Sequence, residues 1–144
     1  MTVFQPVRRA TLLIPSGPAH DPDRKHLFII LTDSVADPLN GNKDCLLLTS
    51  LSTLDTALPH DPTCILRLGD HPFVTRDSYV SYQSSRIQET TKIINGVASG
   101  VLVVKDPMAS GIVDRICDGL LSSPHTAEKI KRFFRIYTAQ QSGL

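Results

Sequence analysis

The 144-residue sequence has no tryptophan, no long apolar run and no excess of one charge, since its formal net charge is +1. With only five Phe and three Tyr, we expect a mostly aliphatic core. No run approaches the roughly 20 apolar residues that cross a bilayer, and residues 1–6 lack the pattern of a secretory signal. The near-zero charge gives no bulk electrostatic argument for nucleic-acid binding. We therefore predict one soluble, cytoplasmic domain over residues 1–144, with no membrane partner.

The cysteine and histidine residues are too far apart in the sequence to suggest a set of disulfide bonds or a metal centre. The three cysteines, Cys45, Cys64 and Cys117, cannot all pair within one chain, and each lies in an apolar stretch. Free cysteine behaves as a small hydrophobic residue, so we expect three buried thiols. No two of the five histidines have the i, i+4 spacing of a helical metal site, and the cysteine spacing fits no zinc pattern. The sequence therefore predicts no metal and no cofactor.

Short apolar segments separated by turn residues fill the first two thirds of the chain. The segments 15–25 and 33–44 are rich in Pro, Gly, Asn and Asp, which indicates loops. The run at 26–32 is apolar at successive positions, which is typical of a central strand buried on both faces. Strands are predicted over residues 11–14, 26–32, 45–50, 63–68, 78–82 and 101–104.

The hydrophobic periodicity changes after residue 105. Apolar residues recur at spacings of three and four over about 107–122 and again over about 124–138, which predicts two amphipathic helices. Asp106-Pro107 and Ser123-Pro124 precede them and are typical helix starts. The sequence therefore predicts an α+β fold, with a small SH3-like β-barrel of five to six short strands at about residues 8–105 and C-terminal helices.

Several cationic and hydroxyl side chains fall at the ends of predicted strands. The tripeptide Arg24-Lys25-His26 enters the central strand, and Thr49-Ser50 ends the next apolar strand. If these strands pair, the groups meet at one sheet edge, where Arg86 and the turn residue His71 could join them. Cations and hydroxyls suit a phosphodiester, because negative charge grows there in the transition state. The alternative is that these are ordinary strand-end and turn residues without a function.

The order of these segments resembles the PemK/MazF family of toxin components from bacterial toxin–antitoxin pairs. A basic residue and an apolar run follow a long loop in that family, as in Arg24–Asp33 here. Its next apolar strand ends in Thr or Ser, as Leu46–Ser50 does. A later Asp-Ser-x-Val segment followed by Arg is matched by Asp77–Val80 and Arg86, and a helical C-terminus follows from Asp106.

The resemblance implies a homodimer that cleaves single-stranded RNA without a metal and is held in check by an antitoxin protein. The catalytic Arg of the family falls on Lys25, or on Arg24 after a one-residue slip. Its Thr or Ser falls on Thr49, with Ser50 adjacent, and Arg86 corresponds to a residue near the RNA groove. The resemblance thus implies Lys25, Arg24 and Thr49 as catalytic residues, and Ser50, Arg86 and His71 are candidate substrate-binding residues.

This chain departs from the family at the central position, where Lys25-His26 replaces an Arg-Pro pair. Lysine lacks the planar fork of arginine, but His26 titrates near neutrality and is therefore a further candidate for general acid–base catalysis. Two alternatives stay open. One is a catalytically inactive barrel that binds protein or nucleic acid, and the other is a structural accessory protein. Which of the three basic side chains faces the groove depends on strand register.

Overall fold

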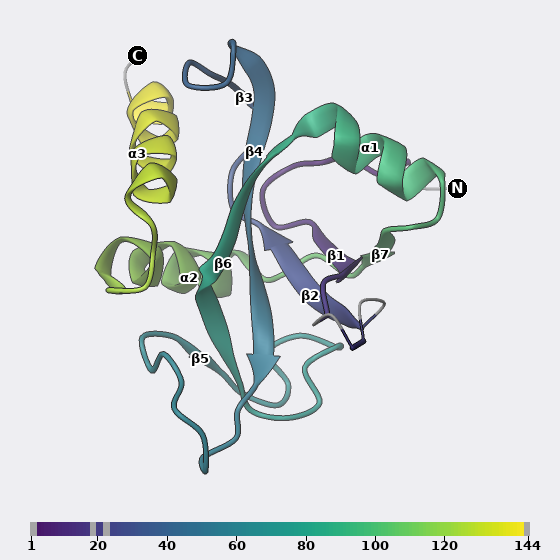
Figure 1. The fold of residues 1–144 in the computed structure, drawn as a ribbon, viewed down its shortest axis with the longest axis vertical. Coiled ribbons are helices and arrows are strands. Elements are labelled where there is room, and N and C mark those ends of the chain that lie inside the picture. Colours follow the sequence, from purple (N-terminus) through teal and green to yellow (C-terminus); the bar gives the residue numbers. More distant parts are fainter. Residues whose placement is uncertain (1–2, 18–19, 22–23, 143–144) are drawn as a thin grey trace.

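The computed structural model describes residues 3–17, 20–21 and 24–142, which form seven strands and three helices (Figure 1). The predicted α+β class is confirmed, although the expected five to six short strands are too few. The elements in chain order are β1 (Thr11–Pro15), β2 (Lys25–Ile30), β3 (Val35–Asp37), β4 (Lys43–Thr53), β5 (Ile65–Leu66), β6 (Ser78–Glu89), α1 (Thr90–Ala98), β7 (Val103–Lys105), α2 (Ser110–Ser122) and α3 (Glu128–Ser142).

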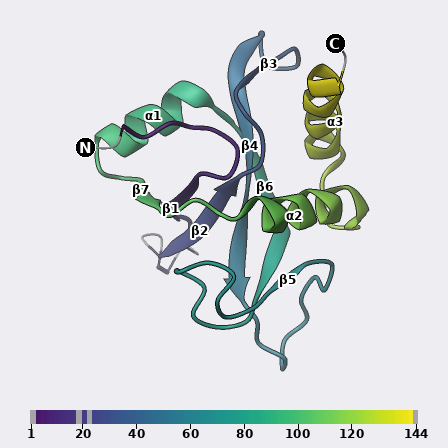
Figure 2. The same ribbon diagram turned by 180° about the vertical axis from the view of Figure 1, so that it is seen from behind.

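The strands form one antiparallel, strongly curled sheet in the order β5-β6-β4-β2-β1-β7, with β3 paired to the start of β4. Two long strands, β4 with 11 residues and β6 with 12, form its axis. Helices α2 and α3 lie on one side of this axis, whereas α1 lies on the other side with β1, β2 and β7 (Figures 1 and 2). No helix in the described part of the chain is long and apolar enough to cross a membrane.

Each face of the sheet has its own apolar cluster because successive side chains of a strand point to opposite faces. Leu27 and Ile29 of β2 pack in the cluster that faces α2 and α3. Phe28 and Ile30 pack in the other cluster, with Ile93 of α1. This explains why β2 is apolar at successive positions, as expected for a central strand. Each fully buried side chain of this size stabilises the fold by about 1.5–3 kcal/mol.

A bulge of several residues in β6 interrupts the pairing of β4 with β6. Paired positions run from Cys45 and Glu89 to Leu48 and Arg86, and pairing resumes at Ser50 and Ser81. Four residues of β6, 82–85, therefore lie opposite the single residue Thr49. The three extra residues are an odd number, so they invert the alternation of β6. As a result Arg86 lies on the same face as Ser50 rather than on the α2–α3 face.

The C-terminal helices begin later than predicted. Asp106-Pro107 is not a helix start, because Thr11 Oγ1 donates to the Asp106 carbonyl at 2.6 Å and the Met108 N–H donates to the Arg9 carbonyl at 2.9 Å. These bonds hold the segment extended beside β1, and α2 begins at Ser110. Residues 123–126 form a turn that delays α3 to Glu128.

Three further segments differ from the sequence prediction, and the first is β3 (Val35–Asp37), a short strand inside the predicted loop 33–44. Helix α1 was not predicted, because its sequence, TTKIINGVA, offers only a short apolar face, with Ile93 buried and Val97 packed against the same cluster. Strand β6 continues far beyond residue 82, although its second half, SSRIQE, is mostly polar. By contrast, the three cysteines are buried and free, as predicted.

Gly119 allows α2 to approach Tyr82. A Cβ atom at Gly119 would lie 2.1 Å from the Tyr82 hydroxyl oxygen, which donates to the Ile116 carbonyl at 2.7 Å. In a helix interior Gly→Ala normally stabilises by about 1 kcal/mol. Here we expect Gly119→Ala to destabilise by about 1–3 kcal/mol through overpacking, with a smaller loss in a Tyr82→Phe background. Urea unfolding of the two single variants and the double variant measures this coupling.

Gly111→Ala is the matched control, because nothing lies within 4 Å of a Cβ atom at that position of the same helix. It should leave the free energy of unfolding unchanged or raise it slightly. Equal effects of the two substitutions would contradict the close approach of α2 to Tyr82.

Candidate functional site

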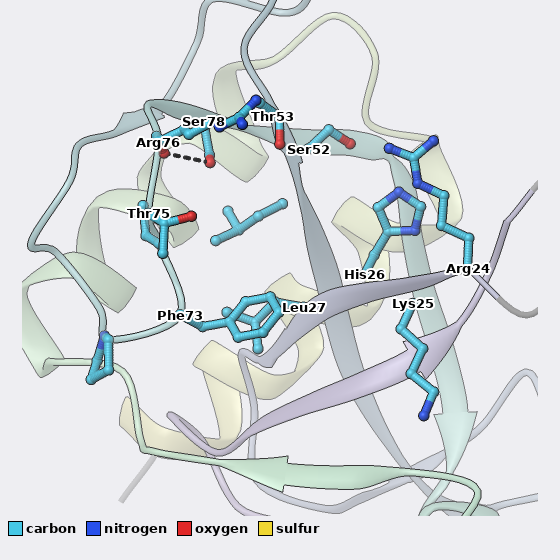
Figure 3. A pocket seen from close by; sticks show the side chains of 13 residues that line it. Arg24, Lys25, His26, Leu27, Ser52, Thr53, Phe73, Thr75, Arg76 and Ser78 are labelled. Carbon is cyan, nitrogen blue, oxygen red and sulfur yellow. Dashed lines mark hydrogen bonds between the residues drawn. The ribbon is translucent and has the colours of Figure 1, made fainter.

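Two adjoining cavities open at the ends of β2 and β4 and share His26 and Ser52. The larger, of about 510 Å³, lies between these strand ends and the 72–78 segment (Figure 3). Its lining is Arg24, Lys25, His26, Leu27, Leu51, Ser52, Thr53, Pro72, Phe73, Val74, Thr75, Arg76 and Ser78. The smaller, of about 70 Å³, is lined by Ser16, His26, Phe28, Ser50, Ser52, Ser84 and Arg86.

Strand register brings the polar groups of the smaller cavity to one face. Phe28 of β2 pairs with Ser50 of β4, and the same register places His26 opposite Ser52. Arg86 arrives on this face because of the bulge in β6. The sequence predicted that cations from β2 and hydroxyls from β4 meet at a sheet edge, and the structure brings His26, Ser50 and Arg86 together there.

His26 is half-buried and held through one ring nitrogen. Its Nδ1 lies 2.8 Å from the Ser16 hydroxyl oxygen. The same hydroxyl lies 3.2 Å from the Ile14 carbonyl oxygen, to which it can donate. A hydroxyl has one proton, and in the tautomer in which Ser16 donates that proton to the Ile14 carbonyl, its oxygen accepts the Nδ1–H of His26. This assignment leaves Nε2 as an unprotonated nitrogen, with no partner among the described residues.

Electrostatics favour the neutral form of His26. Burial, followed by the nearby positive charges of Arg24 and Arg86, lowers the pKa of His26 below its ordinary value of 6.5. The imidazole is therefore mainly neutral at pH 7. A neutral imidazole with a free nitrogen can accept a proton from a bound hydroxyl group, which is what a general base must do.

Arg86 supplies a positive charge without a carboxylate partner. Its guanidinium carbon lies 4.7 Å from the centre of the Phe28 ring, over the ring face, which is a cation–π contact. No ion pair or side-chain hydrogen bond of Arg86 occurs within the described ranges. Burial lowers the pKa of Arg86, but the guanidinium stays charged because the ordinary pKa of this group lies far above neutral pH. Its free N–H donors match the geometry of a phosphate group.

The surroundings of both cavities are cationic. Arg24, Lys25 and Arg76 line the larger cavity, and no Asp or Glu lines either cavity in the described part of the chain. Arg24 and His26 lie side by side, whereas Lys25 extends in the opposite direction (Figure 3). An anion is thus the ligand class that this surface accommodates best. Of the three basic residues predicted here, Lys25 points away from the other two.

Thr49 is not part of this face. It is fully buried and points to the α2–α3 side, because it pairs with Ile29. Its hydroxyl donates to the Ser81 carbonyl at 3.3 Å and accepts from the Ser85 hydroxyl at 3.0 Å. Both partners belong to the part of β6 that forms the bulge. Thr49 therefore braces the bulge that presents Arg86. The alternation of side chains along a strand could have separated Thr49 from Ser50 at the sequence level.

His71 also lies apart from the two cavities. It is buried, its Nδ1 accepts the Phe73 N–H at 3.0 Å, and its Nε2 lies 2.5 Å from the Asp106 carbonyl. Because Nδ1 accepts, Nε2 carries the proton and donates to Asp106. His71 thus ties the 71–74 turn to the segment before α2, and neither ring nitrogen is free for a substrate.

Sequence reasoning missed part of the lining. Phe28 and Ser52 share their sheet face with His26 and Ser50, so alternation along each strand signals them. Ser16 and Arg76 come from loops, and Ser84 comes from the bulge, where no local pattern gives the direction of a side chain. These three positions depend on tertiary contacts alone.

Comparison with known proteins and a search for metal-binding side chains give no further information on the site. The chain matches no protein-family model, no curated protein and no solved structure. Across residues 3–17, 20–21 and 24–142, no group of three or more His, Cys, Asp or Glu side chains could hold a metal ion. The class of the site therefore rests on its own geometry, which is that of an anion site with a neutral histidine beside an arginine in cation–π contact with Phe28.

The bracing role of Thr49 predicts a difference between two small substitutions. Thr49→Val keeps the shape but removes both hydrogen bonds, and we expect it to lower the free energy of unfolding by about 1–3 kcal/mol. Thr49→Ser keeps the hydroxyl and should lose less stability. Urea unfolding with far-UV circular dichroism measures both. Equal losses in the two variants would show that the hydroxyl does not brace the bulge.

Proposed function

We propose that this protein is a metal-independent endoribonuclease that cleaves single-stranded RNA at the His26–Arg86 face. The observation that carries the proposal is a histidine favoured in its neutral form beside an arginine, where neither His26 Nε2 nor Arg86 has a side-chain partner among the described residues. The surrounding hydroxyls support it, and so does the lack of a carboxylate among the described lining residues, because a negatively charged RNA backbone can approach such a surface.

In the proposed reaction His26 Nε2 takes the proton of a ribose 2′-hydroxyl group. The 2′-oxygen attacks the adjacent phosphorus atom, and the bond from phosphorus to the 5′-oxygen breaks. The leaving oxygen takes a proton from water. The products are a 2′,3′-cyclic phosphate and a 5′-hydroxyl end, and the protonated His26 then returns its proton to solvent. DNA has no 2′-hydroxyl and is not cleaved by this route.

Arg86 would stabilise the charge that grows on the phosphoryl oxygens. Its cation–π contact with Phe28 holds the guanidinium group over this face before substrate binds, which would reduce the reorganisation required in the transition state. The hydroxyls of Ser50, Ser52 and Ser84 line the same cavity and can donate to the remaining phosphate oxygens. Arg24 and Arg76, around the larger cavity, would bind neighbouring phosphates of the strand.

The resemblance to the PemK/MazF family leads us to propose three further properties. These are an SH3-like barrel topology, a homodimer and inhibition by an antitoxin protein. An acidic antitoxin segment that fills the larger cavity would pair with Arg24 and Arg76 and exclude RNA. A second candidate function is a catalytically inactive module that binds nucleic acid, which the same cations would serve.

Cleavage of a long single-stranded RNA in EDTA separates these two functions. We expect discrete fragments with cyclic phosphate ends from the wild-type protein, and rates lower by about 10²–10⁴-fold for His26→Ala. Arg86→Lys keeps the charge but loses the planar fork, and it should lose about 10²-fold or more. The control is Lys25→Ala, which should stay within about threefold of wild type because its side chain points away. Binding without cleavage by the wild-type protein would favour the inactive module.

The pH dependence of the rate tests the role of His26. Because its lowered pKa keeps the imidazole neutral down to lower pH, kcat/KM should rise with pH and level off with a midpoint below 6.5. Arg24→Gln removes a nearby positive charge and should therefore move this midpoint upward. The measurement is a pH–rate profile of both proteins at constant ionic strength. An unchanged midpoint would show that His26 does not govern the profile.

A further inference from the structure

A third cavity, of about 200 Å³, adjoins the proposed cleavage site on the other side of β4. Tyr79 of β6 lines it and pairs directly with Ser52, which lines both cationic cavities. Tyr79 therefore shares a sheet face with His26 and lies two strand spacings away, which is about 10 Å. The hydroxyls of Ser81 and Ser84, 3.0 Å apart, connect this cavity to the smaller cationic one.

An aromatic pair forms one wall of this third cavity. The rings of His60 and Tyr79 have centroids 5.5 Å apart at an interplanar angle of 39°, and both side chains are half-exposed. Gln83, which is exposed, also lines the cavity and offers amide donors and an acceptor. Planar rings beside an amide are the groups with which proteins bind an unstacked nucleobase.

The charge in this cavity disfavours a phosphate. Asp61 lines it and is buried, and its carboxylate accepts hydrogen bonds from the Ser123 hydroxyl at 2.6 Å and from the Thr63 N–H at 3.0 Å. A buried carboxylate repels a second anion but not a neutral ring. The third cavity thus differs from the other two, which have cations and no lining carboxylate among the described residues.

We infer that the third cavity binds a nucleobase of the RNA strand, on the same side of the molecule as the phosphodiester held by Arg86, by stacking on Tyr79 and His60. This inference rests on the proposed function for the identity of the strand. It adds a base-recognition site to a cleavage site that contacts only ribose and phosphate. Sequence preference in cleavage would then come from the His60–Tyr79–Gln83 side of the molecule.

The test uses a 2′-O-methyl RNA decamer, which cannot be cleaved, and the same decamer with abasic residues throughout. Fluorescence anisotropy gives the dissociation constant of the full chain for each. We expect Tyr79→Leu to weaken binding of the decamer with bases by about fivefold or more and to leave the abasic decamer unaffected. Tyr79→Phe, the matched control, keeps the ring and should bind as wild type does. Thermal unfolding verifies that the variants are folded.

A second readout does not depend on removing the ring. The chain has no tryptophan, so Tyr79→Trp introduces the only tryptophan, at the stacking position, and its emission can be excited selectively at about 295 nm or longer wavelengths, where tyrosine absorbs little. Its emission should be quenched by the decamer with bases and not by the abasic one. Equal affinities of wild type and Tyr79→Leu, together with no quenching, would overturn the base site. That result would leave the proposed cleavage intact, because cleavage is measured separately with unmodified RNA.

Discussion

The bulge in β6 opposite Thr49 is the constraint on which the rest of the site depends. If the pairing of Ser50 with Ser81 continued without interruption, Arg86 would lie opposite Cys45 and would point into the cluster beneath α2 and α3. A guanidinium group in that cluster would lose its hydration without gaining a partner, which is a large cost. The odd number of inserted residues instead returns Arg86 to the face of His26.

The same bulge sets the electrostatics of the face. Arg86 lies over the Phe28 ring with its donors unpaired among the described residues, and its positive charge helps to lower the pKa of His26. A partly dehydrated cation without a counter-ion binds an anion more strongly than a fully hydrated one, since less water must be displaced. In the proposed reaction the two residues would act together, because the group that attracts a phosphate would also add to the effect of burial in favouring the neutral form of His26.

How far the sequence predicts this molecule depends on whether the determinant is local. The α+β class, the central strand at 26–32 and the buried cysteines follow from composition and apolar patterns. The late start of α2 depends on bonds between Asp106 and Thr11, which are far apart in the chain. The direction of Arg86 depends on a bulge within a mostly polar segment. Period-two patterns along one strand cannot reveal either feature.

The candidate site residues also divide into positions that local sequence patterns predict and directions of side chains that only the fold determines. The sequence predicts cationic and hydroxyl groups at Arg24-Lys25-His26 and Thr49-Ser50 without showing which of them face the site, since neighbouring residues of a strand point to opposite faces. His26 and Ser50 therefore reach the site, whereas Thr49 braces it from behind and Lys25 extends away from it (Figure 3). The resemblance placed the basic catalytic group on Lys25 or Arg24. In this fold, the residue with an anchored ring, a free nitrogen and a pKa suited to proton transfer is His26. We therefore place the proposed general base at His26, which stands where the PemK/MazF family has the proline of its Arg-Pro pair.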